Sequence, residues 1–319
     1  MADVIDAVLR CLVVLGVFMV VPLVIGQMEH KAMAHMQSRV GPMEAGGFHG
    51  WAQLVADGVK FVQKEDVTPA RADRGVFRLA PFVALVPYLV ALAVVPLSPR
   101  VVGADVDASV VLVLAAVGVG VVGTLMAGWA SANKYSLLGG MRAGAQLVSY
   151  ELPLVLSVAS VALAAGTLSV IGIAEAWTPW WLLWQLPAMV VFFVAGLAEL
   201  QRPPFDMPVA DSEIVFGAFT EYTGLRFAFF LLAEYAGIVV FSLLFAVLFL
   251  GGWAGPLEAT LGWLWTLLKG FLVAVVVIWL RVSWPRMRED QLQRLAWVWL
   301  VPLSLFQLAL TAVGVVMVR

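Results

Sequence analysis

Residues 199–235 read ELQRPPFDMPVADSEIVFGAFTEYTGLRFAFFLLAEY, a charged segment rich in proline that continues directly into a long apolar one. Acidic residues stand on both sides of the boundary, and Glu234 lies well inside the apolar part. A carboxylate at membrane depth is energetically costly and is rare without a functional reason. This stretch therefore predicts a membrane helix that begins beside a proton site or a ligand site.

The composition of the whole chain sets the class of protein. Of its 319 residues, 62% are hydrophobic and 13% are charged, and the mean hydropathy is +0.97. A soluble domain carries about 25% charged residues and at most about half apolar ones, whereas an apolar helix of about 20 residues crosses a bilayer. The sequence therefore predicts an all-α integral membrane protein.

A single membrane domain over residues 1–319, with eight transmembrane helices, is expected from the charge-free stretches. The expected spans are about 8–28, 79–99, 108–132, 147–172, 178–200, 224–251, 260–281 and 295–317, and the longer loops between them are 29–78, 133–146, 201–223 and 282–294. The first span lacks a basic n-region and a small-residue cleavage site, so we expect it to remain as an anchor.

The positive charges indicate the orientation of the chain. All of the 19 Lys and Arg residues except Arg10, Arg100, Lys269 and Arg319 fall in those four loops or at their edges. Because cytoplasmic loops collect Lys and Arg, we expect these loops in the cytoplasm and both termini outside. The tryptophans of residues 177–184 are typical of an aromatic belt at the outer interface.

The first loop contains a helical pattern of its own. Apolar residues recur three or four positions apart at Phe48, Trp51, Val55, Val59 and Val62, with polar residues on the opposite face. The pattern predicts an amphipathic helix that lies flat in the cytoplasmic interface. From the pattern alone, a surface helix that only closes the bundle is the preferred interpretation.

Three kinds of site are disfavoured. Cys11 is the only cysteine, and His30, His35 and His49 have no partner at ligand spacing, so we expect no iron–sulfur or zinc site in this chain alone. A GxGxxG pattern at 118–123 lies inside a charge-free span, so close helix packing explains it better than dinucleotide binding. The basic residues follow no recognition motif, which excludes nucleic acid as a partner.

Acidic residues gather in the cytoplasmic half of the expected spans. They are Glu29, Glu151, Glu199, Glu221 and Glu234. The outer half of the spans has no matching acid, so the set indicates either a ligand chamber that opens inward or a proton path that another protein of a larger complex completes. For any single glutamate, a structural pairing with Arg202, Lys134 or a backbone group is the alternative.

Several long runs occur in a distinctive order. They are EHKAMAHMQSRVGP (29–42), LVADGVKFVQKEDVTPARAD (54–73), ASANKYSLLGGMRAGAQLVSYELPL (130–154), RPPFDMPVADSEI (202–214), TEY (220–222), AEY (233–235) and PRMREDQLQRLAW (285–297). Together with eight expected spans, these runs resemble, over nearly the whole chain, the family of quinone-chamber membrane subunits of respiratory complex I, the NADH:quinone oxidoreductase.

The resemblance implies a membrane subunit of a proton-pumping translocase in a bacterial plasma membrane. Such a subunit docks the peripheral redox arm on its cytoplasmic face and forms the chamber through which quinone, ubiquinone or menaquinone, reaches its reduction site. The implied partners are the peripheral subunits with the terminal iron–sulfur cluster and the quinone site, small and antiporter-like membrane subunits, and lipid. No covalent or metal cofactor is implied in this chain, and the amphipathic helix would frame the quinone entrance.

The resemblance also assigns residues. The implied quinone-chamber residues are Glu29, His30, Gln37, Arg39, Asp57, Phe219, Arg281 and Arg286, and the implied proton-path residues are Glu151, Asp211, Glu213, Glu221 and Glu234. Three positions depart from the family pattern, since Val209 replaces a usual glutamate, His30 a usual arginine and Phe219 a frequent histidine. The alternatives are an ion-translocating subunit of a group 4 hydrogenase or another ferredoxin-linked complex, and a stand-alone transporter.

Overall fold

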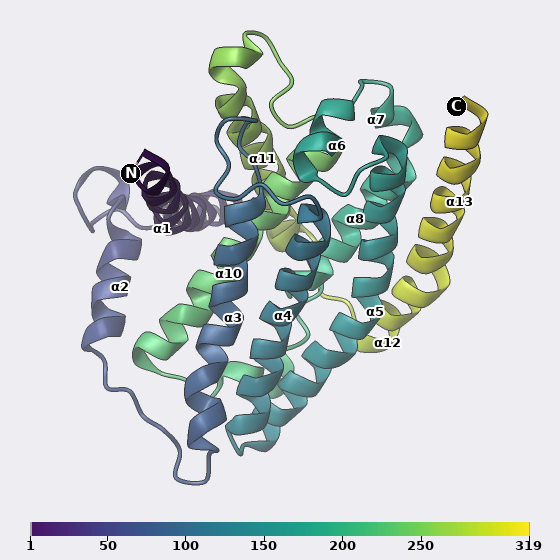
Figure 1. Ribbon diagram of the computed structural model, residues 1–319. Helices are drawn as coiled ribbons and strands as arrows, with labels where there is room; N and C mark the ends of the chain where they lie inside the picture. Colours follow the sequence, from purple (N-terminus) through teal and green to yellow (C-terminus); the bar gives the residue numbers. More distant parts are fainter. Residues whose placement is uncertain (1, 319) are drawn as a thin grey trace.

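The computed structural model describes residues 2–318 and shows a chain that is helical almost throughout (Figure 1). The long helices are α1 (Ala2–Met36), α3 (Arg74–Val94), α4 (Ser109–Ala130), α5 (Lys134–Ala165), α10 (Gly224–Phe249), α11 (Glu258–Ser283) and α13 (Val301–Val318). The shorter ones are α2 (Gln53–Gln63), α6 (Val170–Ala176), α7 (Trp181–Trp184), α8 (Leu186–Glu199), α9 (Asp211–Ile214) and α12 (Glu289–Arg294). Within the described chain, β-pairing is confined to one isolated bridge, between Ser98 and Val101.

Among the described residues, seven segments are long and apolar enough to cross a membrane, and they confirm an all-helical membrane protein. Six of these segments come from α1, α3, α4, α5, α10 and α11, and the seventh runs from α12 through a π-helical turn, Leu295–Leu300, into α13. The segment expected to cross at 178–200 is different, because it divides into α7 and a 14-residue α8. Pro187, in the first turn of α8, has no amide hydrogen to continue a preceding helix.

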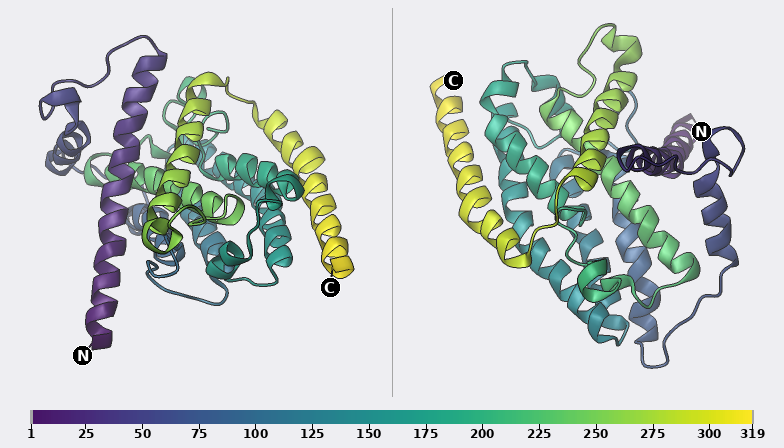
Figure 2. Two further views of the ribbon diagram at one scale, coloured as in Figure 1. Left: turned by 90° about the horizontal axis from the view of Figure 1, so that it is seen from above. Right: turned by 180° about the vertical axis from the view of Figure 1, so that it is seen from behind.

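The helices form a bundle with α10 at its centre. α3, α4, α5 and α13 run roughly side by side, whereas α1 is seen nearly end-on in the same view and so crosses them steeply (Figure 1). Figure 2 shows α1 lengthwise along one flank and α13 along the opposite one. α10 is the most buried of the seven spans, since it packs against α1, α3 and α11.

The expected loop 133–146 is mostly helix. α5 starts at Lys134, where the side chain of Asn133 caps it by accepting a hydrogen bond of 2.9 Å from the Tyr135 amide. α5 then runs for 32 residues to Gly166, a left-handed residue that ends it. The charges at 134 and 142 hid this extension from a hydropathy reading of the sequence.

The glycines of α4 let its neighbours approach closely, which confirms the packing interpretation of the GxGxxG pattern. A Cβ built at Gly123 would lie 2.4 Å from the Ala84 amide nitrogen on α3, and one at Gly120 would lie 3.0 Å from the Tyr88 ring. At Gly128 a Cβ would lie 2.5 Å from a backbone oxygen of α5. Any larger residue at these points would force the helices apart.

Two sets of polar side chains make hydrogen bonds between helices, away from the long loops. The Lys269 ammonium group donates to three carbonyls of the turn after α10, those of Leu250, Gly252 and Ala254, at 2.8, 2.8 and 2.9 Å. A second set, buried and uncharged, joins α5, α8 and α13 through Ser160, Gln185, Gln307 and Thr311. Hydrogen bonds between helices satisfy polar groups that lipid cannot.

The first loop carries a helix, α2, whose apolar face the chain leaves uncovered. Val55, Val59 and Val62 are 52%, 52% and 67% exposed, and Trp51 just before the helix is 65% exposed. The segment is anchored to α1, because Gln27 donates a 3.0 Å hydrogen bond to the Gly50 carbonyl. A helix with one open apolar face is typical of contact with lipid or with another protein.

Candidate functional site

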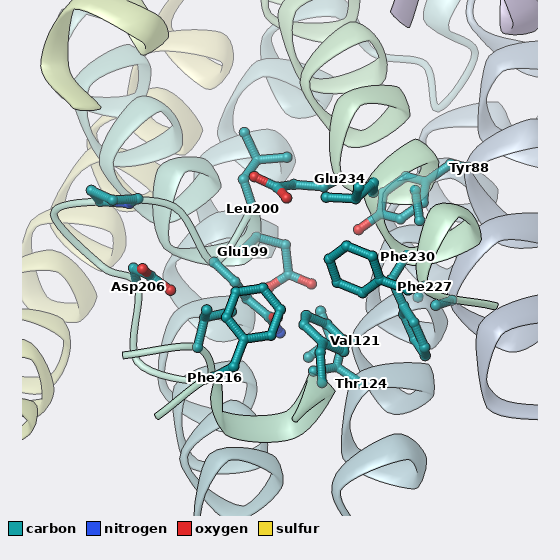
Figure 3. Close-up of a pocket in the computed structure, with 18 of the residues that line it drawn as sticks. Tyr88, Val121, Thr124, Glu199, Leu200, Asp206, Phe216, Phe227, Phe230 and Glu234 are labelled. Carbon is teal, nitrogen blue, oxygen red and sulfur yellow. The ribbon is translucent and has the colours of Figure 1, made fainter. Parts of the chain in front are cut away.

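A cavity of about 210 Å³ lies where the end of α8 meets α3, α4 and α10 (Figure 3). Its walls are mostly aromatic and aliphatic, and the segment between α8 and α10 closes one side. The lining residues are Ala84, Tyr88, Gly120, Val121, Thr124, Glu199, Leu200, Gln201, Pro203, Asp206, Val209, Phe216, Phe219, Phe227, Phe230, Leu231, Ala233, Glu234 and Arg281. Apolar walls with a few convergent polar groups are typical of ligand sites.

Glu199, the last residue of α8, is the deeply buried carboxylate of this cavity. It is 5% exposed, and neither of its carboxylate oxygens has a hydrogen-bond partner in the described part of the chain. Its carboxylate and the Tyr88 hydroxyl point into the same space (Figure 3), and Glu151 on α5 lies close enough to interact with Glu199 electrostatically. A buried polar group without a partner is costly, so Glu199 is suited to bind a proton or to accept a hydrogen bond from a ligand.

Beside the cavity lies a cluster of four charges from four different elements, Glu29, Arg202, Glu234 and Arg281, which we call the four-charge cluster. Arg202 donates to Glu29 at 2.5 Å and pairs with Glu234 at 2.7 Å, while Arg281 pairs with the other oxygen of Glu29. Glu29 and Arg202 are each only 1% exposed. Their charges are therefore compensated by one another rather than by water.

The segment 200–223 is held in place by hydrogen bonds and by a glycine. The amide nitrogen of the Gln146 side chain donates to two backbone carbonyls around its start, at 2.6 and 2.9 Å. Further on, Gly217 has a φ of +51°, and a Cβ there would lie 1.8 Å from the Pro208 carbonyl oxygen. Only glycine fits this position, and it brings the aromatic residues that follow against the cavity.

Residues 65–68 of the first loop contact the beginning of α10, close to the segment 200–223. Arg226 pairs with Asp66 at 2.9 Å and donates to the Thr68 hydroxyl at 2.9 Å. The Thr223 hydroxyl accepts from the Val67 amide and donates to a neighbouring carbonyl, both at 3.2 Å. Glu65 and Asp66, with the two residues that follow them, thus hold the beginning of α10 in place.

Three of the chamber residues implied by the resemblance reach the cavity or its cluster, and a fourth, His30, follows Glu29 on α1. Phe219 and Arg281 line the cavity, and the ring of Phe219 packs on that of Phe230 with 4.5 Å between centres. Glu29 belongs to the four-charge cluster. His30 is next to it on α1, and its buried Nδ1 has no hydrogen-bond partner among the residues described.

The other four chamber residues lie elsewhere. Gln37 and Arg39 are exposed at the end of α1 and bond to each other at 2.8 Å, and Asp57 is bonded to its neighbours on α2. Arg286 is half-buried, 4.0 Å from the Met207 sulfur. The structure does not bring these four side chains into the cavity.

Two of the implied proton-path residues approach Glu199. Glu234 lines the cavity and belongs to the four-charge cluster. Glu151 lies across from Gly118 of α4, where a Cβ would be 3.2 Å from its carboxylate oxygen. The missing side chain at Gly118 leaves room for this carboxylate between α4 and α5.

The remaining proton-path residues lie nearer the surface. Glu221 accepts a 2.6 Å hydrogen bond from Asn133. Glu213 accepts one of 2.6 Å from Arg142, and this bond holds the pKa of Glu213 below its ordinary value. The side chain of Asp211 lies outside the described residues. Glu213 and Glu221 thus join the segment 200–223 to the start of α5.

Sequence reasoning missed several members of the site. Glu199 was placed among the acids but given no role, and Arg202 was considered only as a pairing partner. Both residues lie at the start of the stretch 199–235. The sequence offered one indication for Tyr88, because its hydroxyl is a polar group inside an expected span. Gln146 lies in a segment that was expected to be a loop, and nothing in the sequence indicated a role for it. Among the described residues, no group of three or more His, Cys, Asp or Glu side chains is arranged to hold a metal ion.

Comparison with known proteins gives consistent matches along nearly the whole chain. The sequence model of the NADH dehydrogenase family matches residues 9–312. The chain is 46% identical over 290 residues to the H subunit of the NADH-quinone oxidoreductase of Geobacillus kaustophilus, covering 89% of this chain and 86% of that protein. It is 45% identical to the proteins of the same name from Geobacillus thermodenitrificans, over 290 residues, and Bacillus cytotoxicus, over 287 residues. Those matches cover 89% of this chain and 87% and 86% of the two relatives.

Proposed function

This chain belongs to the NADH dehydrogenase family as the H subunit of NADH-quinone oxidoreductase, a membrane subunit of complex I, and on that premise we propose that it forms the quinone-access chamber and the acidic link to proton translocation. The observation that carries the proposal is the cavity in which an unpartnered buried carboxylate, Glu199, adjoins the four-charge cluster. Relatives at 45–46% identity are named as quinone oxidoreductase subunits, and we take quinone as the substrate here.

The cavity suits the head group of a quinone. Its volume of about 210 Å³ is below the range of roughly 300–1,000 Å³ typical of whole drug-sized ligands, so it fits a ring with small substituents better than a long molecule. Phe216, Phe219, Phe227 and Phe230 line it and offer faces for ring stacking. The Tyr88 hydroxyl can donate a hydrogen bond to a quinone oxygen.

Charge provides the link to protons. Reduction of a quinone to a quinol takes up two electrons and two protons, and the electrons would come from a cluster in a partner protein of the complex. Little water would separate a charge in the cavity from Glu199 and the four-charge cluster. The electrostatic interaction between them is therefore weakly screened and strong. A proton that Glu199 gives up or takes on can pass towards Glu151 on α5.

We assign the wider surfaces from the same premise. The loops with most of the Lys and Arg residues would face the cytoplasm of a bacterium and dock the peripheral arm, with Arg286, Gln37 and Arg39 on that face. The open apolar face of α2 would lie in the cytoplasmic interface and frame the entrance for quinone. α7 and α8 together with the segment 200–223 would complete an eighth crossing, and both termini would lie outside.

The test uses the intact complex, reconstituted in vesicles, with Glu199→Gln in this chain. The amide has the size of the acid but cannot exchange a proton, so we expect full assembly with proton pumping reduced at least about tenfold. Glu151→Gln should act in the same direction, and the exposed Glu175→Gln is the matched control. Quinone reduction and the pH gradient are measured together. Wild-type pumping in Glu199→Gln would remove the acidic link from the proposal.

A further inference from the structure

The cavity beside Glu199 holds two buried polar groups of opposite kind. Both oxygens of the Glu199 carboxylate lack a hydrogen-bond partner among the described residues, and so does the side-chain amide nitrogen of Gln201, which lines the same cavity. A carboxylate oxygen accepts a hydrogen bond, whereas an amide nitrogen donates one. A ligand that satisfies both groups must therefore donate at one point and accept at another.

The backbone holds these two residues in fixed positions. The Gln201 amide donates to the Ala198 carbonyl at 2.9 Å, which closes the end of α8. The Gln146 side chain donates to the carbonyls of Ala198 and Phe205, on either side of the pair. Residues 199 and 201 are two apart in the chain, so their Cα atoms lie at most about 7 Å from each other. One ring with an oxygen on each side can therefore reach both side chains.

Gln201 adopts a backbone conformation that is unfavourable for glutamine. Its φ is +53°, in the left-handed region that costs conformational energy for a residue with a Cβ. Such a conformation persists only where the surrounding structure imposes it, and residues of this kind gather at functional sites. In this conformation Gln201 lines the cavity directly after α8 ends.

The two redox forms of a quinone ring differ in what they offer Glu199 and Gln201. A quinone has two carbonyl oxygens, which only accept hydrogen bonds, so it can satisfy Gln201 but leaves Glu199 without a donor. A quinol has two hydroxyl groups, which both donate and accept. Protonation of Glu199 would not remove the difference, because one of its oxygens would still carry no hydrogen. A buried acceptor that is left without a donor weakens binding.

We propose that this cavity binds the reduced ring, the quinol, in preference to the quinone, with a quinol hydroxyl donating to Glu199 and a ring oxygen accepting from Gln201. This preference rests on the proposed function, because a quinone ring is taken as the ligand of the cavity. The Tyr88 hydroxyl points into the same space as the Glu199 carboxylate (Figure 3) and can bond to the second ring oxygen. Glu199 then distinguishes the two forms, and Gln201 holds either of them.

The test measures equilibrium binding to the full chain, purified in mild detergent and kept under argon. The probes are a ubiquinone analogue with a short side chain, its quinol, and the dimethyl ether of that quinol, which keeps the ring but lacks both O–H groups. Isothermal titration calorimetry gives the dissociation constant of each probe. We expect the quinol to bind at least about tenfold more tightly than the other two, because it alone satisfies Glu199.

Two variants separate the roles of the residues. Glu199→Met removes the acceptor at similar length, so it should weaken quinol binding about tenfold, leave quinone binding unchanged or tighter, and abolish the preference. Gln201→Met removes the donor, so it should weaken both forms by about five- to tenfold and keep their ratio. Gln63→Met, at an exposed position of α2, is the matched control and should bind all three probes like the wild type.

The wild type alone can overturn the preference, so the test does not depend on the folding of a variant. Equal affinities for quinol and quinone would mean that water satisfies Glu199, and the cavity would still hold a ring as in the proposed function. A preference that survives Glu199→Met would also overturn the role of this carboxylate. If neither form bound, or if both variants left the affinities unchanged, the quinone cavity of the proposed function would fall as well.

Discussion

At the residue scale, Arg202 is the side chain on which the buried charges depend. It compensates Glu29 at 2.5 Å and Glu234 at 2.7 Å while being 1% exposed. Arg202→Gln should leave Glu234 without its cation and Glu29 with Arg281 alone, and breaking a buried set of this kind costs about 3–5 kcal/mol. Thermal unfolding of the purified complex should show a clear fall in the midpoint, together with less assembled complex in the membrane.

Arg288→Gln supplies the matched control for this loss. Arg288 pairs with Asp290 at 3.3 Å, but the two side chains are 80% and 70% exposed, and exposed pairs contribute at most about 1 kcal/mol. Combining Arg202→Gln with Glu234→Gln should recover part of the stability, because the uncompensated carboxylate is removed while Glu29 keeps Arg281. Equal losses in Arg202→Gln and Arg288→Gln would contradict the account of the cluster.

Glu213 gives a prediction about pH. Its hydrogen bond from Arg142 holds its pKa below the ordinary value of 4.5, so the folded state binds this proton less readily than the unfolded chain. The contact therefore adds stability above about pH 4.5, and the gain is lost as the pH falls through the lower folded value. Hydrogen exchange of the segment 200–223, corrected for intrinsic rates, should show protection that decreases as the pH is lowered from about 4.5.

Arg142→Gln should remove this part of the pH dependence, while Lys60→Gln, at a 72% exposed side chain on α2, should keep it. The effect is small because Glu213 is 45% exposed and water screens the pair. An identical pH profile in wild type and Arg142→Gln would show that another group controls the segment.

The sequence revealed acids but not their partners. Glu29 and Glu234 stood out because carboxylates are rare at membrane depth. Their common partner, Arg202, is 173 residues away from Glu29 in the chain, and no local pattern encodes a contact over that distance. Gln37, Arg39 and Asp57 were assigned through resemblance alone, and in this chain their side chains stay at the surface.

At the scale of elements, the contact between α3 and α4 depends on Gly123. A Cβ there would lie 2.4 Å from the backbone of Ala84, so Gly123→Ala should push the helices apart and cost about 1–3 kcal/mol. Gly16→Ala, on α1, meets nothing within 4 Å and should leave stability unchanged or slightly raised. Thermal unfolding of the two variants in detergent is the measurement, and equal midpoints would refute the close contact.

Seven of the eight expected spans coincide with helical segments long and apolar enough to cross a membrane. Two stretches differ from the expected helices, for different reasons. At 178–200 the apolar run is continuous, but Pro187 and the hydrogen bonds of Gln185 divide it into α7 and α8. At 133–146 the charges suggested a loop, yet Asn133 caps a helix whose glycines pack against α4 and the segment 200–223. Both differences arise from capping and tertiary contacts, which hydropathy does not measure.

At the scale of the whole molecule, the orientation can be read by labelling. In a Cys11→Ser background, Ala104→Cys and Ala70→Cys place single thiols at exposed positions on two loops. An impermeant maleimide added to intact cells should label Ala104→Cys, and should label Ala70→Cys only after permeabilisation, because the loop with most Lys and Arg is expected inside. The reverse pattern would invert the chain in the membrane.

The shortness of α8 has an electrical consequence. Its 14 residues span about 21 Å, less than the roughly 30 Å of a hydrocarbon layer, so a crossing in which α8 begins at the outer surface would leave Glu199 short of the cytoplasmic one. Moving a unit charge through the full transmembrane voltage is worth about 2.3 kcal/mol per 100 mV. A proton that reaches Glu199 past the segment 200–223 crosses only a small part of that field. The charge state of Glu199 should therefore follow the proton concentration on that side and respond only weakly to the voltage.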